Sequence, residues 1–250
     1  MTGTPPTLSV VILTLDEERN IAECIASVKG ADEVLVVDAG STDRTGELAR
    51  EAGAKVIERP MTDFAEQRNF ANEQVTCDWV LHLDADERAT PELLQEMRLT
   101  AAAPAANAYR VPELTYIFGA PQHHGGWYPQ YHVRFQRKGH GRWGRSVHEG
   151  YTADGPVGHL KADIVHFAHP TIQAFIGKMN RYTDLDARQV AGSRTVIALR
   201  AVFEPGPYFL YKYVVQQGFR DGWRGFCIAS LLAVYRSLTY LKALELRFQT

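Results

Sequence analysis

The sequence predicts an α/β protein with a doubly wound, mostly parallel sheet and a helical C-terminal extension. Through the first hundred residues, short runs of Val, Ile and Leu alternate with segments of helical periodicity, as they do where helices connect parallel strands. From Thr171 onward the apolar residues follow the i, i+3, i+4, i+7 spacing of a helix, beginning with Ile172, Phe175, Ile176 and Met179.

Four strands and four helices are expected in the first hundred residues. Asp16 is expected to cap the first helix, Gly53 to end the second, and Thr90-Pro91 to begin the fourth. This alternating order requires right-handed crossovers between parallel strands. The strands are expected at residues 8–13, 33–37, 54–57 and 79–83, and the helices at residues 21–28, 45–52, 63–74 and from 91 onward.

Residues 104–170 differ in composition from the first hundred. They are rich in Gly, Pro, aromatic residues and His, which indicates loops around an active site more than a second core. Short strands are expected there at residues 108–114, 131–136 and 163–167.

Composition is typical of a folded, soluble chain, with 45% hydrophobic and 22% charged residues. The net charge of −2 gives no sign of nucleic-acid binding. Residues 205–250 hold six Lys or Arg and two acids, a charge of +4 that leaves −6 for the rest. Three scattered cysteines indicate reduced thiols in a cytoplasmic setting, and no secretory signal is expected.

Two carboxylates, Asp84 and Asp86, stand directly after the expected strand at residues 79–83. Ligands of open α/β sheets bind at the carboxyl ends of strands. Paired oxygen ligands suit Mg²⁺ or Mn²⁺, which keep open positions for phosphate oxygens. The pair therefore predicts a metal-assisted phosphate site, with a solvated acidic turn as the alternative.

Four motifs stand in the first hundred residues, at Thr14–Asn20, Val36–Asp43, Gln67–Asn69 and Leu83–Glu87, and three shorter ones follow at Gly126–Tyr128, Val133–Phe135 and Val147–Glu149. The four motifs occur in the order found in family 2 glycosyltransferases with the GT-A fold, which the chain resembles over residues 8–97. The shorter motifs extend the resemblance to about residue 150, and within the family the chain is similar to bacterial lipopolysaccharide-core β-1,4-glucosyltransferases.

A nucleotide-sugar site needs a base pocket, a diphosphate clamp and a face open to the acceptor. Asp86 is expected to hold the metal, which neutralises the leaving diphosphate. Alternatives stay open: Asp38 and Asp43 could cap helices, Asp16 and Glu17 could be first-turn acids, and Arg68 could be a surface cation. The donor-binding candidates are Thr14, Leu15, Asp16 and Glu17 for the base, Asp38, Gly40 and Ser41 for the base or ribose, Arg68 for the base or a phosphate, and Asp84 for the ribose.

An inverting transfer needs a general base that deprotonates the acceptor hydroxyl. The resemblance implies that a carboxylate in the acceptor region has this role, and Glu149 is the candidate. The chain has His-Glu where many members have Glu-Asp or Asp-Asp, and Asp154 and Asp163 are the rival bases.

Eight of the nine histidines lie between His123 and His169, in a spacing that matches no standard zinc site. His148, beside Glu149, is the candidate second metal ligand. Trp127 and Tyr128 are expected to stack on an acceptor sugar, or else to anchor a loop, and Arg134 to contact a phosphate of the donor or acceptor.

The tail after the helix-breaking Pro205-Gly-Pro207 contains two apolar, aromatic runs at residues 208–215 and 226–235. The longer run is short for a membrane span and is interrupted by Arg236, so an interfacial amphipathic hairpin is expected. Packing on the core or a homodimer interface are the alternatives. The expected domains are a glycosyltransferase domain at 1–204 (donor half 1–103, acceptor half 104–170, helical 171–204) and a membrane-associated tail at 205–250.

The resemblance implies an inverting, metal-dependent transfer of a hexose from a UDP-sugar, with GDP and dTDP left open. The expected acceptor is lipid-linked or a lipopolysaccharide core, at the inner face of the cytoplasmic membrane. A polyprenyl-phosphate glycosyltransferase and a non-catalytic nucleotide- or glycan-binding scaffold are the alternatives. A nucleotidyltransferase is disfavoured, because Thr14-Leu-Asp-Glu-Glu stands where that class has a Gly-rich loop.

Overall fold

The computed structural model describes residues 5–144 and 150–248 and divides into two compact units. The first unit comprises residues 1–113 and 130–166, and the second comprises residues 114–129 and 167–250. The helices at residues 171–204 pack together with the tail at residues 205–250 in the second unit. The functional boundary at residue 204 stays a prediction.

The first unit is built on a mixed sheet whose strand order is β3-β2-β1-β4-β8-β6-β12-β5. The four strands from β3 to β4 are parallel, and β4–β8, β8–β6 and β12–β5 pair antiparallel. The strands are β1 Leu8–Thr14, β2 Glu33–Asp38, β3 Lys55–Glu58, β4 Trp79–Asp84, β5 Glu87–Ala89, β6 Ala108–Ile117, β7 Ala120–Pro121, β8 Gln130–Arg137, β9 Gly141–Gly144, β10 Gly150–Ala153, β11 Val157–His159 and β12 Ile164–His169.

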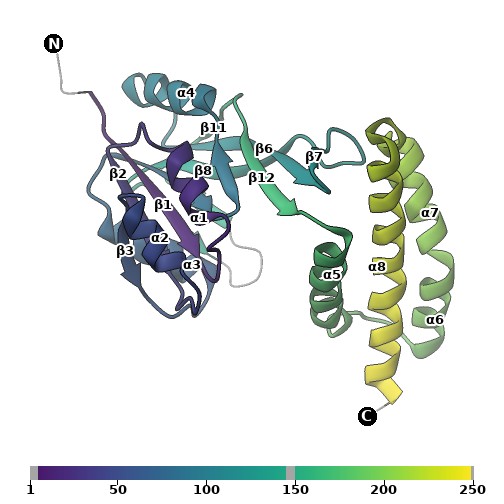
Figure 1. The fold of residues 1–250 in the computed structure, drawn as a ribbon. Coiled ribbons are helices and arrows are strands. Elements are labelled where there is room, and N and C mark those ends of the chain that lie inside the picture. Colours follow the sequence, from purple (N-terminus) through teal and green to yellow (C-terminus); the bar gives the residue numbers. More distant parts are fainter. Residues whose placement is uncertain (1–4, 145–149, 249–250) are drawn as a thin grey trace. The chain divides into compact units, whose positions relative to one another are not determined.

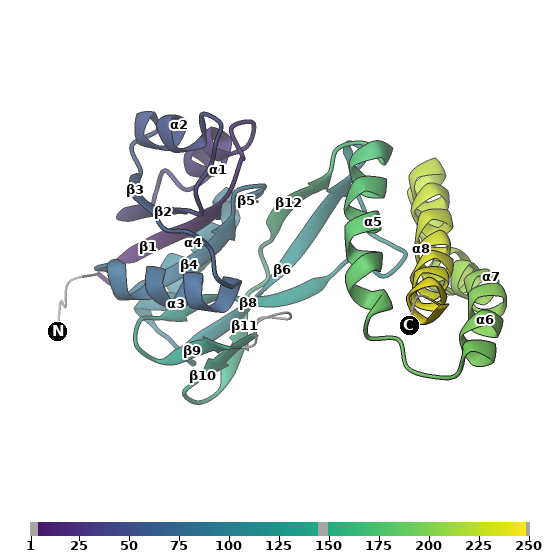
Figure 2. The same ribbon diagram turned by 90° about the horizontal axis from the view of Figure 1, so that it is seen from below.

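Helices cover both faces of the parallel strands, which confirms the predicted doubly wound α/β class. The helices α1 (Ile21–Ser27), α2 (Thr45–Glu51) and α4 (Pro91–Ala102) pack with one face, where Ile12, Val36 and Leu81 are fully buried. Helix α3 (Phe64–Gln74) packs on the other face, against Val11, Leu35 and Val80 (Figure 2).

Side-chain caps start several of the helices. Thr90 Oγ1 accepts from Leu93 N at 3.2 Å, and Asp63 and Thr171 cap α3 and the helix Ile172–Ala187 in the same way. Among the described residues, α1 begins at Ile21 after an Asn20 that makes no side-chain cap bond, and α2 also begins without one. The prediction that Asp16 caps this helix is therefore wrong, because its carboxylate binds the neighbouring loop instead.

The second unit is helical apart from the strand segments that reach it. Helix α8 packs against α5, α6 and α7 (Figure 1). Two apolar clusters result, one around Phe175 and Ile228 and one around Ile197 and Tyr240. The helices are α5 Ile172–Ala187, α6 Arg194–Phe203, α7 Pro205–Leu210, a π-helical turn Tyr211–Val215, a 3₁₀ turn Gly218–Asp221 and α8 Gly222–Phe248.

The helix α8 is longer than the apolar run that predicted it. It continues through Arg236 to Phe248, and the segment Gly218–Phe248 is long and apolar enough to cross a membrane by length and composition. The expectation that this part is too short to span is therefore not supported by the helix length. Core helices of soluble proteins meet the same criterion, and 28% of the apolar window is buried.

The core of the first unit can be tested with two leucines of α4. Leu93 is fully buried, whereas Leu99 on the same helix is 67% exposed. Leu93→Ala should lower the free energy of unfolding by about 2–5 kcal/mol, because a cavity remains where the side chain packed. Leu99→Ala should change it by less than about 0.5 kcal/mol. Urea unfolding followed by circular dichroism measures both, and equal effects would contradict the assigned core.

Candidate functional site

Three predicted donor-site residues lie in one row at the carboxyl ends of adjacent parallel strands. Thr14 is paired with Asp38 across β1 and β2, and Leu13 with Asp84 across β1 and β4. The strand order changes direction between β1 and β4, which is where ligands of doubly wound sheets bind. Thr14 Oγ1 is buried without a hydrogen bond to any residue that the structure describes, so this edge retains an unused polar atom.

The first two strand–helix loops are bonded to each other. Asp16, which has a positive φ of 53°, donates its N–H to Ser41 Oγ at 2.9 Å. Its Oδ1 accepts from Thr42 N at 2.7 Å. Glu17 N donates to Thr45 Oγ1 at 2.7 Å. The two loops therefore form one rigid wall beside the strand ends.

Asp38 organises the turn that follows its strand. Its Oδ1 accepts from Gly40 N at 3.2 Å, Ser41 N at 2.9 Å and Ser41 Oγ at 2.7 Å. Gly40 has a φ of +101°, a conformation that favours glycine. These bonds give Asp38 a local role in the turn, and they differ from the helix cap that was the alternative for Asp38. Contacts of Asp38, Gly40, Ser41 and the exposed Leu15 with a donor stay predictions.

A buried ion-pair network lies under the same edge. Arg68 Nη2 donates to Asp84 Oδ1 at 2.8 Å, and Arg134 Nη2 donates to Asp84 Oδ2 at 3.2 Å. Burial raises the pKa of Asp84, but the two guanidinium groups outweigh it and hold the pKa well below its ordinary value. Arg68 is 1% exposed, which rules out the surface-cation alternative.

Glu87 completes this network from β5. It is fully buried, accepts from Arg134 Nη2 at 2.7 Å and from Asp84 N at 2.8 Å, and its burial raises its pKa. The register of β6 and β8 shifts between the Tyr109–Phe135 and Arg110–Val133 pairs, so Arg134 is the extra residue of a β-bulge. Bulges redirect side chains, and this one accompanies the inward position of Arg134.

Next to the network, His166 joins two further carboxylates. Its Nε2 lies 3.2 Å from Asp86 Oδ2, and its Nδ1 lies 2.7 Å from Glu113 Oε1. Burial lowers the pKa of His166, but hydrogen bonds to these carboxylates outweigh it and raise the pKa to about 10. The imidazole therefore carries two protons at neutral pH and donates to both acids.

The residues here fit a divalent metal. One ligand atom each from Glu87, Glu113 and His166 lie within 4.8 Å of one another, and Asp86 is bonded to the same imidazole. Glu87 is fully buried and already paired with Arg134, whereas the Asp86 side chain is 24% exposed. Carboxylate and imidazole ligands suit Mn²⁺, and carboxylates suit Mg²⁺. Asp86, Glu113 and His166 are therefore better placed than Glu87 to act as ligands.

Helix α3 connects the strand β9 to the carboxyl ends of the parallel strands. The Asn69 amide binds the backbone of Trp143 in both directions, at 2.9 and 3.0 Å, and Arg68 Cζ lies 5.0 Å from the Trp143 ring. Gly144 pairs with Gly150 across residues 145–149. The predicted base Glu149 and metal ligand His148 lie outside the described residues, so both stay predictions.

The two rival bases occupy different places in the first unit. Asp154 is exposed and its backbone N–H donates to His140 O, at the end of the β9–β10 hairpin away from Gly144. Asp163 precedes β12, and its carbonyl accepts from Thr90 Oγ1 at 3.1 Å.

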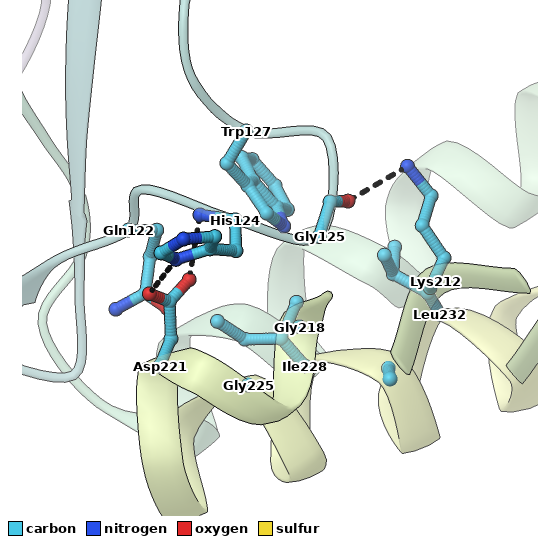
Figure 3. Close-up of a pocket in the computed structure, with 11 residues that line it drawn as sticks. Gln122, His124, Gly125, Trp127, Lys212, Gly218, Asp221, Gly225, Ile228 and Leu232 are labelled. Atoms are coloured by element: carbon cyan, nitrogen blue, oxygen red, sulfur yellow. Dashed lines mark hydrogen bonds and ion pairs between the residues drawn. The ribbon is translucent and has the colours of Figure 1, made fainter. Parts of the chain in front are cut away.

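The predicted acceptor residues Trp127 and Tyr128 belong to the second unit. Trp127 is half-buried against the cluster around Phe175, beside a small cavity that Figure 3 shows. Along this cavity His124 N and Nδ1 each lie 2.8 Å from an Asp221 oxygen, and Lys212 Nζ donates to Gly125 O at 3.1 Å (Figure 3). These contacts support the loop-anchor alternative for Trp127, and a role in acceptor binding stays a prediction.

Sequence reasoning missed Glu87, Glu113 and His166 as members of the cluster. A signal was present, because Glu113, Arg134 and His166 each stand within a predicted strand in the His- and aromatic-rich part of the chain. A charged residue at a buried strand position needs a partner, so three such positions indicate a shared polar cluster.

Comparison with known proteins bears on the family of this chain. The family model described as glycosyl transferase family 2 matches residues 9–150. A lipopolysaccharide core biosynthesis glycosyltransferase, LpsC, of Rhizobium meliloti (strain 1021) is 34% identical over 94% of this chain and 91% of that protein. An uncharacterized glycosyltransferase of Rickettsia typhi is 29% identical over 97% of this chain and 88% of that protein.

Among solved structures, glucosyl-3-phosphoglycerate synthase from Mycobacterium tuberculosis, crystallised with Mn²⁺, UDP and glucosyl-3-phosphoglycerate, shows a partial likeness. It has a TM-score of 0.39 and 23% identity over 44% of each chain. The match of the family model to more than half of the chain, together with the full-length similarity to LpsC, shows that this protein is a glycosyltransferase of family 2.

Proposed function

We propose that this glycosyltransferase transfers a hexose from a nucleotide sugar, with UDP as the expected nucleotide, to a lipopolysaccharide-core or other lipid-linked acceptor. The observation that carries the proposal is the row of Thr14, Asp38 and Asp84 along three adjacent strand ends, next to Asp86 and His166. The similarity to the Rhizobium meliloti lipopolysaccharide core enzyme supports the acceptor class.

The donor would occupy the carboxyl edge of the parallel strands. The wall formed by residues 14–17 and 38–41 suits a base and ribose, because it offers backbone groups and side-chain oxygens held by mutual hydrogen bonds. Asp84 would accept from a ribose hydroxyl while Arg68 and Arg134 balance its charge.

Asp86 and His166 would hold Mn²⁺ or Mg²⁺. When bound, the metal neutralises charge on the leaving diphosphate. His166 must give up a proton to become a ligand, since only a neutral imidazole nitrogen can coordinate. The proposed ligand His148 lies in the segment at residues 145–149.

The proposed reaction is a single displacement with inversion. Glu149 takes the proton of the acceptor hydroxyl while the acceptor oxygen bonds to the anomeric carbon. The bond between that carbon and the diphosphate oxygen breaks, and the nucleoside diphosphate leaves with the electron pair. Trp127, Tyr128 and Arg134 were predicted to contact the acceptor, although Arg134 already pairs with Asp84 and Glu87.

Attachment to the inner face of the cytoplasmic membrane fits a lipid-linked acceptor. Among the described residues, 20 of the 24 large apolar side chains that are exposed belong to the second unit. The tail at residues 205–250 carries a charge of +4. Apolar and basic residues together favour an anionic lipid surface.

Asp86→Ala tests the metal. The variant should remain folded but lose Mn²⁺- or Mg²⁺-dependent donor hydrolysis and transfer, and EDTA should have the same effect on the wild type. Glu73→Ala, an exposed acid of α3, is the control and should keep full activity. Wild-type activity that EDTA leaves unchanged would remove the metal from the reaction, and absence of any hydrolysis or transfer with every sugar nucleotide would favour a non-catalytic scaffold.

Glu149→Gln tests the base. Glutamine keeps the shape and the hydrogen-bonding capacity of the side chain but cannot accept the proton, so turnover should fall by roughly 10²–10⁴-fold. Binding of UDP-sugars, measured as a thermal shift, should persist. If turnover stays near that of the wild type, the base is another acid, and Asp154→Asn and Asp163→Asn are the next variants.

Membrane attachment is best tested in the full chain, because α8 completes the apolar clusters of α5 and α6. Leu210 and Val215 are 56% and 67% exposed in the second unit. Replacing both by Glu should weaken co-sedimentation with phosphatidylglycerol vesicles at least about tenfold, since each buried apolar side chain contributes about 1.5–3 kcal/mol. Leu99→Glu in the first unit is the matched control. A wild type that never pellets, even at low salt, would refute attachment.

A further inference from the structure

An open groove lies in the second unit between α8 and the segment from Phe203 to Tyr211. It has a volume of about 370 Å³ and is lined by Phe203, Glu204, Pro207, Tyr208, Tyr211 and Arg236. This volume lies in the range of small-ligand sites. The lining combines aromatic walls with one cationic side chain.

Two cations approach the same aromatic ring of this groove. Arg236 Cζ lies 4.6 Å and Lys212 Nζ lies 5.9 Å from the centre of the Tyr208 ring. Stacking uses the flat face of the guanidinium and leaves its N–H groups in the plane. In the part of the chain that the structure describes, Arg236 donates no hydrogen bond, and neither cation forms an ion pair. The N–H groups of Arg236 are therefore available to donate to oxygen atoms of a ligand.

The nearby carboxylate of Glu204 is already bonded to other donors. Glu204 Oε1 accepts from Arg200 Nε at 2.5 Å, and its Oε2 accepts from the Tyr240 hydroxyl. Burial and the Arg236 charge lower the pKa of Lys212, which fits two neighbouring cations that no carboxylate separates. With Glu204 balanced by Arg200, the charge of Arg236 remains uncompensated in the groove, and Lys212, which lines the cavity of Figure 3, adds a second positive charge near Tyr208.

The surroundings of the groove are apolar. Val202 and Phe203 at the end of α6 are 71% and 67% exposed, and Leu210 and Tyr211 are 56% and 47% exposed. A soluble phosphate would gain nothing from these side chains. An acyl chain would cover them, at a gain of roughly 25 cal/mol per Å² of apolar surface.

We infer that this groove binds the phosphate headgroup of an anionic phospholipid, with Arg236 as the phosphate ligand, Lys212 as a second positive charge near Tyr208 rather than in the lining, and the aromatic walls against the glycerol and upper acyl chain. The inference rests on the proposed membrane attachment, to which it adds one defined lipid site. Arg236 is the preferred residue to change, because Lys212 also donates to Gly125 O and its loss would disturb that loop.

The test uses full-length protein and dihexanoyl phosphatidylglycerol, a short-chain lipid, below its micellar concentration. Titration calorimetry should give saturable binding of one lipid, and Arg236→Gln should weaken it about tenfold, the usual loss for a charged hydrogen-bonded contact. Arg236→Lys should recover part of the affinity. Arg220→Gln removes the same charge from an exposed arginine whose side chain donates to Gln217 Oε1, and this variant should bind the lipid like the wild type.

Equal loss in Arg236→Gln and Arg220→Gln would overturn the site, because it would show general charge attraction only. Inorganic phosphate or glycerol 1-phosphate binding as tightly as the lipid would overturn the lipid assignment. Thermal unfolding checks that each variant is folded. Pelleting of the wild type with vesicles decides membrane attachment separately, and donor hydrolysis, which Arg236→Gln should leave unchanged, decides the catalytic proposal.

Discussion

The geometry of the site depends on the burial of opposite charges under the strand ends. Arg68 and Glu87 are almost completely buried, and Asp84 and Arg134 bring the opposite charges to them. Removal of one member of such a network leaves an uncompensated charge, at a cost of about 3–5 kcal/mol. Because these residues come from α3, β4, β5 and β8, the network fixes the antiparallel strands against the parallel half of the sheet.

The parallel half of the first unit could be predicted from the sequence. Parallel strands buried on both faces need runs such as Val10–Leu13, and the residues after such runs fall at one edge whatever the rest of the chain does. The row of Thr14, Asp38 and Asp84 could therefore be predicted from order and spacing alone. The bulge at Arg134 could not, because it depends on the register between β6 and β8.

The short strands β5, β9, β10 and β11 were not predicted either, since three or four residues are too few for a periodic pattern to appear. His166 stood within a predicted strand, but its partners Asp86 and Glu113 lie 80 and 53 residues away in the sequence. In the second unit, helical spacing identified apolar faces without their partners. It did not show that α5 and α6 share clusters with α8.

Consecutive residues of α3 connect the donor edge to the segment that carries the proposed base. Arg68 binds Asp84 and lies against the ring of Trp143, while Asn69 binds the Trp143 backbone through both amide atoms. Trp143 stands two residues before residue 145, where the segment with Glu149 begins. A helix turn is stiff compared with a loop, so a shift of Asp84 would be transmitted to the end of the β9–β10 hairpin that holds Trp143 and Gly144. The same helix thereby positions Asp84, the carboxylate proposed to bind the donor ribose. It also positions the residue that stands just before the segment with the proposed base Glu149.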